Sequence, residues 1–323
     1  MRVGGHMEEF AGLPVFAYPL DEDGPRSGPL PAPESVAWRV EVSWEADKSW
    51  EQYFERFLDE VDTTAVSALV IGTWVGEDDY DKGSESVIDA LVAARDRLPA
   101  LRSVFLGDIT SEENEISWIR QGSVAPLFEA FPRLEEFGVR GAINLEIPVE
   151  RHERLRSLTV QTGGLSAEVV RAIAAADLPA LTHLEVWLGT ENYGADVVID
   201  DLAPIMTGER LPKLRHLALR NSDIQDEICG ALAAAPVVAR LDSLDLSMGV
   251  LTDDGAAALL TGQPLGHLKS LDMRHNYLTD AMRARLREVL EPADVELRSD
   301  AGTAWEDGTE EDGDLRRFVA VGE

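Results

Sequence analysis

The feature that most constrains this chain is a short apolar pattern, Leu-x-x-Leu-x-Leu, which recurs about eight times along the 323 residues. The clearest copies begin at Leu214, Leu241 and Leu268, and weaker copies extend the series back to Val66. A unit this short cannot bury an apolar face alone, so successive units must stack and share one continuous core. The sequence therefore predicts a repeat architecture.

The spacing of the copies indicates what each repeat contains. Their middle apolar residues are 21 to 35 residues apart, and the last two steps are 27. Between them lie apolar stripes at helical spacing, preceded by capping residues such as Ser84, Ser166 and Thr279. Each repeat is therefore expected to be a short strand, a turn and a helix. The middle residues of the expected strands are Leu69, Val104, Phe137, Leu158, Leu184, Leu217, Leu244 and Leu271.

These repeats resemble the leucine-rich-repeat superfamily. Residues 271–280 match its longer repeat, including a ladder asparagine at Asn276, and the step near 27 is similar to the ribonuclease-inhibitor-like subclass. The resemblance implies an α/β solenoid, a curved horseshoe with parallel strands on the concave face and helices on the convex face. Other repeats lack the asparagine, which implies irregular curvature. Its position is occupied by Gly163, Gly189, Ser222 and Gly249.

A second resemblance is narrower. Residues 106–119, together with residues 35–39, look like a group of bacterial cytosolic leucine-rich-repeat proteins for which no activity is established. That group is encoded near radical-SAM and hydrolase-like proteins. The resemblance implies a helper in a bacterial biosynthetic pathway.

The pattern divides the chain into three stretches. Residues 1–61 are expected to be an N-terminal extension and cap, residues 62–299 to hold about eight repeats, and residues 300–323 to be an acidic tail with an apolar end. The apolar end, residues 315–321, would dock on the C-terminal cap or bind something else. Both alternatives stay open, with docking favoured.

The N-terminal stretch contains the cap itself. Residues 36–61 combine a strand with an amphipathic helix over 48–61, opened by a capping box of Ser49 and Gln52. The Pro/Gly-rich residues 14–33 are expected to form an extended covering loop. Residues 1–6 are expected to add nothing that packs.

Composition narrows the partners and the compartment. The formal net charge of −31 disfavours nucleic acid and anionic lipid; it would favour a basic partner or serve only solubility. No apolar run approaches the roughly 18 residues of a membrane helix, and we identify no signal peptide. The single Cys229 is expected to be a buried filler. Together these features predict a cytoplasmic protein.

Candidate partner-binding residues alternate with the apolar ladder, because such residues point to the concave face. An exposed Trp and Arg are typical interface anchors, which favours a patch around Trp187 and Arg220. The alternatives are ordinary solvated positions, and packing of Trp187 on Tyr193 in its own loop. The predicted partner-binding residues are His183, Glu185, Trp187, His216, Arg220, Asp245, Asp272, Arg274, Arg140 and Phe105.

Three further features of the sequence bear on the site. Asp245 and Asp272 are expected to face each other, which would raise the pKa of one carboxylate. The long insertion 108–121 is either functional or a packing segment. The acidic residues 76–81 lack the ligand spacing of a calcium loop and are expected to be a solvated turn.

The sequence contains no Gly-rich phosphate loop, no nucleophile elbow and no His-Glu-x-x-His. We therefore predict a non-catalytic scaffold, without cofactor or metal, that binds a partner protein or peptide on the concave face. The first alternative is a metal- or small-ligand-binding protein or enzyme that uses His183, Glu185 and His216, since two His and one Glu are a possible zinc set. The second alternative is a structural subunit of an oligomer. The partner and the oligomeric state stay undetermined.

Overall fold

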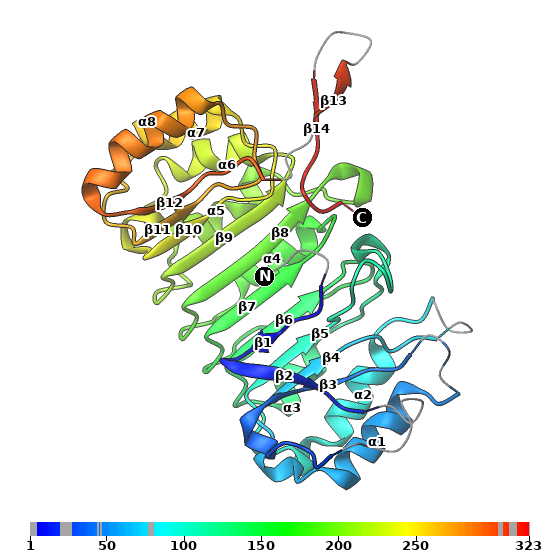
Figure 1. Ribbon diagram of the computed structural model, residues 1–323. Helices are drawn as coiled ribbons and strands as arrows, with labels where there is room; N and C mark the ends of the chain where they lie inside the picture. Colours follow the sequence, from blue (N-terminus) through cyan, green and yellow to red (C-terminus); the bar gives the residue numbers. More distant parts are fainter. Residues whose placement is uncertain are drawn as a thin grey trace. The chain divides into compact units, whose positions relative to one another are not determined.

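The structure is a computed structural model that describes residues 5–19, 28–43, 45, 47–76, 81–302, 306–309 and 315–322. The chain divides into two compact units, the first ending at Leu158 and the second beginning at Thr159. Figure 1 shows the strands and helices of both units. Within the described residues no helix is long and apolar enough to cross a membrane. The predicted turn at 76–81 lies largely outside these residues.

The first unit is built on a parallel sheet. Strand β2 pairs with β3, β3 with β4, β4 with β5 and β5 with β6, all parallel, whereas β1 pairs antiparallel with β2. The strands are β1 (Glu9–Phe10), β2 (Leu13–Ala17), β3 (Ala37–Val40), β4 (Ala68–Ile71), β5 (Ser103–Leu106) and β6 (Glu136–Arg140). The helices are α1 (Trp50–Glu60), α2 (Glu85–Ala93) and α3 (Ala125–Ala130).

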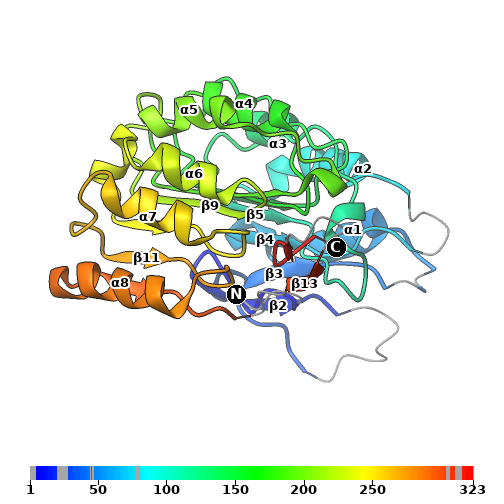
Figure 2. The ribbon, with the colours of Figure 1, turned by 90° about the horizontal axis from the view of Figure 1, so that it is seen from above.

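The second unit repeats the arrangement with strand β8 paired to β9, β9 to β10, β10 to β11 and β11 to β12, all parallel. Figure 2 shows its helices in a row along one face of the strands. Strand β7 (Ser157–Gln161) contains the division between the units. The strands are β8 (His183–Gly189), β9 (His216–Ser222), β10 (Ser243–Asp245), β11 (Ser270–Asp272) and β12 (Glu296–Arg298). The helices are α4 (Ala167–Ala175), α5 (Ile199–Thr207), α6 (Gln225–Leu232), α7 (Asp253–Thr261) and α8 (Asp280–Leu290).

Shorter elements complete the chain. Strands β13 (Glu306–Thr309) and β14 (Leu315–Arg317) form a separate antiparallel pair. The 3-10 helices are η2 (Pro33–Ser35), η3 (Thr63–Ala65), η5 (Arg95–Arg97), η6 (Ile116–Trp118), η7 (Glu191–Tyr193), η8 (Pro236–Arg240) and η9 (Glu291–Ala293).

The apolar ladder is in register within each unit. Leu69 pairs with Val104 and Val104 with Phe137, while in the second unit Leu184, Leu217, Leu244, Leu271 and Leu297 follow one another across five strands. All of these except the terminal Leu297 are buried. The strand positions inferred from the repeat are confirmed, and so is the α/β leucine-rich-repeat fold class.

The predicted helix starts are also present, although Ser84, at the start of α2, makes no side-chain capping hydrogen bond. Ser49 and Gln52 form the reciprocal capping box at the first turn of α1, and the Nε1 of Trp50 donates to the carbonyl of Val40, 3.0 Å away. The side-chain oxygens of Ser166 and Thr279 accept main-chain hydrogen bonds at the starts of α4 and α8. These contacts satisfy donors that the first turn of a helix leaves unpaired.

Asn276 acts as the predicted ladder residue. Its Nδ2 donates to the carbonyls of Leu246 (2.9 Å) and Met273 (3.1 Å), and its Oδ1 accepts from the amide of Leu251 at 3.1 Å. In repeats that lack the asparagine, other side chains donate hydrogen bonds to the main-chain carbonyls of the ladder. The buried Gln225 Nε2 donates to the carbonyl of Leu219.

Glycine replaces the ladder asparagine where two turns approach closely. The amide of Thr190 donates to the carbonyl of Gly163 at 2.8 Å, and Gly164 bridges to Gly189. Gly189 has a φ of 75°, and a Cβ there would overlap the Gly163 carbonyl. Only glycine combines this backbone conformation with this close approach.

Candidate functional site

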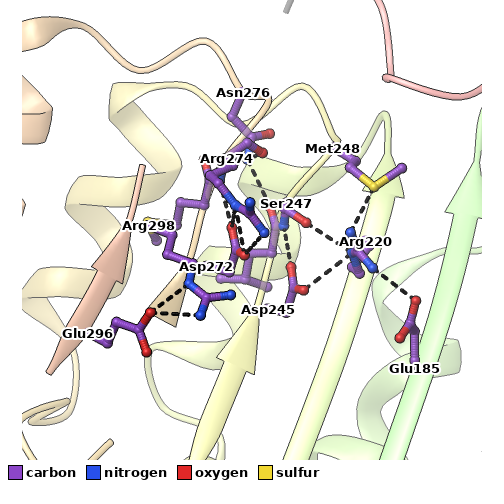
Figure 3. Close-up of polar contacts among 12 residues, drawn as sticks. Glu185, Arg220, Asp245, Ser247, Met248, Asp272, Arg274, Asn276, Glu296 and Arg298 are labelled. Atoms are coloured by element: carbon purple, nitrogen blue, oxygen red, sulfur yellow. Dashed lines mark hydrogen bonds and ion pairs between the residues drawn. The ribbon is translucent and has the colours of Figure 1, made fainter. Parts of the chain in front are cut away.

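The face of β8–β12 that carries no helices presents a chain of charged side chains, which Figure 3 shows in close-up. We call this set the charged row. Arg220 on β9 links both neighbouring strands: its Nη1 lies 2.9 Å from Glu185 Oε1 on β8, and its Nε lies 3.3 Å from Asp245 Oδ2 on β10. Arg220 Nε also donates to Ser247 Oγ at 2.9 Å. Side-chain alternation places these residues opposite the apolar ladder.

The row continues on the last two strands. Arg274 Nη2 lies 2.6 Å from Asp272 Oδ2, and Arg298 Nη2 lies 2.7 Å from Glu296 Oε1. The side chains of Arg274 and Arg298 are 39% and 48% exposed. Each guanidinium is therefore oriented by a carboxylate yet remains accessible. Glu296 and Arg298 were not among the predicted residues, although they lie on either side of Leu297, the last leucine of the ladder, where the alternation rule would have identified them.

The predicted juxtaposition of two carboxylates is present, since Asp245 and Asp272 are direct partners across β10 and β11. Burial raises the pKa of Asp245 above its ordinary 3.8; Arg220 opposes this rise, and Asp272 adds to it. The direction agrees with the prediction. The largest cause is loss of solvent around the carboxylate rather than repulsion between the two charges.

Trp187 is not the exposed anchor that the sequence predicted. It is only 4% exposed, its Nε1 donates to Glu185 Oε1 at 2.7 Å, and the Arg220 guanidinium lies 5.3 Å from its ring centroid. The same carboxylate that pairs with Arg220 thus holds the indole. Trp187 is a positioning residue of the charged row, and it offers a partner almost no surface.

His183 and His216 are brought together by the register of β8 and β9. Their rings stack with centroids 3.9 Å apart. Burial lowers the pKa of both imidazoles, and the neighbouring ring lowers that of His183 further. His216 Nδ1 contacts Ser243 Oγ at 2.7 Å, and Glu185 is engaged by Arg220 and the indole of Trp187.

This geometry does not fit the alternative metal set of His183, Glu185 and His216. The ring planes of the two histidines are 11° apart, so their in-plane lone pairs run side by side and do not converge on one ion. Glu185 Oε1 already accepts hydrogen bonds from Trp187 Nε1 and Arg220 Nη1. A zinc site needs ligands directed at a common point.

Phe105 and Arg140, predicted on the same open face, are covered in the first unit. Phe105 is 2% exposed because Phe10 of β1 packs edge-on against it, with ring centroids 6.0 Å apart. Arg140 is also buried; its Nη1 donates to the carbonyl of Ile109 at 2.7 Å. Both residues were predicted to be exposed on this face, and the structure buries them instead. The N-terminal hairpin of β1 and β2 contributes Phe10 to an apolar cluster that also contains Ala37, Ala68, Val70 and Phe105.

The N-terminal residues that cover this face differ from the prediction in two ways. Residues 14–17, expected as part of the loop 14–33, belong to strand β2 of the sheet; residues 20–27 of that loop lie outside the described residues. His6, expected to pack on nothing, contacts the buried Asp108, whose carboxylate also accepts from the amide of Met7 at 3.2 Å. The hydrogen bond to Asp108 is the main cause that raises the pKa of His6.

One group of three described residues could hold a metal ion: His6, Glu41 and Glu113, whose ligand atoms lie within 4.8 Å of one another. Arg39 is already at this place, since its Nε is 3.0 Å from Glu41 Oε2 and its Nη1 is 3.5 Å from Asp108 Oδ2. A guanidinium inside the set neutralises the carboxylates that would attract a cation. We therefore describe the group as an ion-pair cluster.

The insertion 108–121 contains both packing and exposed side chains. Ile116 and Ile119 are buried, while Trp118 is 59% exposed. The packing interpretation holds for the two isoleucines but not for the tryptophan. The buried Gln121 Nε2 donates to the carbonyl of Arg140 at 2.7 Å, which ties the end of the insertion to β6.

The C-terminal segment 318–322 docks, but not on the terminal strand and helix, where the sequence favoured it. It lies against the C-terminal end of β9 and the turns that follow β10 and β11. Asn221 and Tyr277, which bind it, were not predicted as functional. The predicted filler Cys229 is buried, and burial raises the pKa of its thiol.

Stacked strand–helix units with this apolar ladder define a leucine-rich-repeat fold, and the comparisons with known proteins support assigning the chain to that superfamily. The family described as "Leucine Rich repeat" matches residues 210–233 and 241–260. Proteins with this fold are commonly protein–protein interaction scaffolds and are generally not enzymes.

Two solved structures are similar to the chain. A Bacteroides fragilis protein known from a crystal structure is 28% identical, with 88% of this chain and 78% of that chain covered and a TM-score of 0.76. An internalin from Listeria monocytogenes is 16% identical over 73% of this chain and 54% of that chain, with a TM-score of 0.39, which is too low for a comparison of folds. No curated protein matches the sequence.

Proposed function

We propose that this chain is a non-catalytic interaction protein that binds a partner protein or peptide on the helix-free face of its second unit. The observation that carries the proposal is the charged row. Arg220 is held by carboxylates on both neighbouring strands, and the more exposed Arg274 and Arg298 are each held by a carboxylate two residues earlier in the chain. Holding a side chain before binding reduces the entropy lost on association. Arginine and tryptophan dominate the energetics of interfaces, and here the tryptophan acts through the arginine it supports.

The character of the row indicates the chemistry of the partner. Among its principal members, the carboxylates of Glu185, Asp245, Asp272 and Glu296 outnumber the guanidiniums of Arg220, Arg274 and Arg298. Together with the overall charge of −31, this excess of carboxylates favours a partner with basic side chains, which would pair with the carboxylates of the row. The same partner would also carry hydrogen-bond acceptors for the exposed guanidiniums. Such contacts give orientation and specificity.

The first unit is a less favourable surface, because the N-terminal hairpin covers the residues that would otherwise be exposed. Phe105 and the neighbouring Val70 are buried beneath it. A partner would have to displace the hairpin before it reached this face. The proposal is therefore confined to β8–β12.

The test is a pair of charge-matched variants. R274E/R298E reverses two exposed arginines of the row, and R285E/R287E makes the same charge change on exposed positions of α8. Partner capture from native cell extract, at low and moderate salt and quantified by mass spectrometry, is expected to fall at least about tenfold for the first variant, equivalent to about 1.4 kcal/mol. The control should capture at the level of the unmodified protein.

Equal capture by both variants would place the partner elsewhere on the chain. Equal loss in both would show that only the net charge matters. A folding defect is separated from a binding defect by comparing the thermal unfolding midpoints of the two variants.

A further inference from the structure

The C-terminal segment 318–322 is held as an extended peptide by the turns of three successive repeats. Tyr277 Oη donates to the carbonyl of Phe318 at 2.8 Å and accepts from its amide at 2.9 Å. The amide of Ala320 donates to the carbonyl of Met248 at 2.8 Å. Figure 1 shows the end of the chain, in red, beyond the strands of the second unit.

Asn221 makes a two-point contact with the main chain of the segment. Its Oδ1 accepts from the amide of Val321 at 2.9 Å, and its Nδ2 donates to the carbonyl of the same residue at 2.6 Å. Asn221 is fully buried, so neither group could be satisfied by solvent while the segment is bound. A side-chain amide that pairs with both polar groups of one residue recognises an extended peptide without regard to its side chain.

Two of the residues that bind the segment, Asn221 and Met248, are equivalent in the repeat, and His275 is the corresponding residue of the next repeat. Asn221, Met248 and His275 are 27 residues apart, and each has a positive φ, of 53°, 72° and 56°. This conformation is costly for residues other than glycine. Asn221 and Met248 use it where they bind the segment.

The segment also inserts side chains at alternate positions. Val319 and Val321 are buried, whereas Phe318, which follows β14 directly, is exposed. The ring of Tyr193 abuts Gly322, where an added Cβ would lie 2.9 Å from Cε2. The occupied surface thus accepts small aliphatic side chains two residues apart, followed by glycine.

We propose that these turns form a peptide-binding groove whose built-in occupant is residues 318–322, and that the groove accepts in trans an extended partner peptide with β-branched aliphatic side chains at positions i and i+2. The hydrogen bonds to the peptide main chain give affinity, and the two buried valine positions give selectivity. The tethered segment competes with such a partner, because its effective concentration is on the order of millimolar for a short linker. This groove adjoins the charged row, since Arg220 Nη2 contacts Met248 Sδ at 2.9 Å, but other groups bind the segment, and the inference does not depend on the proposed function.

The experiment uses the full chain and a fluorescein-labelled synthetic peptide of residues 315–323. V319D/V321D introduces charges at the two buried positions, which releases the tethered segment and vacates the groove. Fluorescence anisotropy is expected to show binding to this variant at least about tenfold tighter than to the unmodified chain. A peptide that itself carries both aspartates should not bind.

Two substitutions in the groove complete the test. In the V319D/V321D background, Asn221→Gly removes the amide but retains the positive φ, and Tyr277→Phe removes the hydroxyl but retains the ring. Each should weaken peptide binding by roughly tenfold, as expected for one or two lost hydrogen bonds. Binding that is unaffected by both, or no binding to the vacated variant, would overturn the proposal.

A second measurement keeps the inference testable if V319D/V321D does not fold. In the unmodified chain, excess unlabelled peptide should increase deuterium exchange at the amides of Ala320 and Val321 in proportion to its concentration. No increase at millimolar peptide would show that the segment is a fixed part of the fold. A dimer of the unmodified chain that becomes monomeric in V319D/V321D would assign the groove to a second copy and also overturn the proposal.

Discussion

Replacing Phe105 with alanine tests whether the N-terminal hairpin is an integral layer of the first unit. An aromatic side chain buries about 150–250 Å², which at about 25 cal/mol per Å² corresponds to about 4–6 kcal/mol. Alanine retains part of this area, and phenylalanine-to-alanine changes in cores cost about 3–5 kcal/mol. Because Phe105 is buried against Phe10 and lies 5.7 Å from the Arg140 guanidinium, we expect a loss within this range.

Urea unfolding monitored by circular dichroism gives the free energy of unfolding, and native-state hydrogen exchange reports on residues 7–17 separately. Trp118→Ala is the control, since an exposed side chain should change stability by less than about 0.5 kcal/mol. A double-mutant cycle of Phe105→Ala with Phe10→Ala should give a coupling of about 0.5–1.5 kcal/mol. A loss for Phe105→Ala as small as that of the control would show that the ring is solvated, as the sequence alone predicted, and would refute the reasoning.

Three further outcomes are expected. Asn276→Ala should cost about 1–3 kcal/mol for each buried main-chain group left unpaired, whereas the exposed Asn192→Ala should change the urea midpoint little. The raised pKa of Asp245 means that ionisation destabilises the folded state, so stability is lost as pH rises from 3.8; the advantage of Asp245→Asn should grow between pH 4 and 7, and a constant difference would contradict the shift. The raised pKa of His6 means that the folded state favours the charged imidazolium. The stability that His6 contributes is complete below pH 6.5 and is lost as pH rises through the folded-state pKa. Hydrogen exchange at residues 7–17 should therefore increase over that pH range, and His6→Gln should remove this dependence.

Much of the charged row could be predicted, because side-chain alternation is a local rule. Once the ladder leucines were placed, Arg220, Asp245 and Asp272 followed on the opposite face. The roles within the row could not be predicted. Trp187 is buried because Glu185, two residues earlier on the same strand, binds its indole and also pairs with an arginine from the next strand.

The covering of Phe105 was beyond sequence reasoning for another reason. The residue lies at an outward position, as the alternation rule requires, but a segment about 95 residues earlier in the chain supplies the ring that buries it. Nothing in the pattern of β5 records that contact. The same holds for Asn221 and Val321, whose partnership spans 100 residues.

What the sequence by itself determined is the repeated unit: the register of the ladder, the helix starts and the face on which each strand residue lies. These depend on residues within a few positions of one another, where strand alternation and capping operate. The tertiary structure alone decided which outward residues remain accessible, because the two chain ends return to the repeats. Each of these segments contacts strands or turns that are about 100 residues away in the sequence, and the repeat pattern contains no information about such contacts.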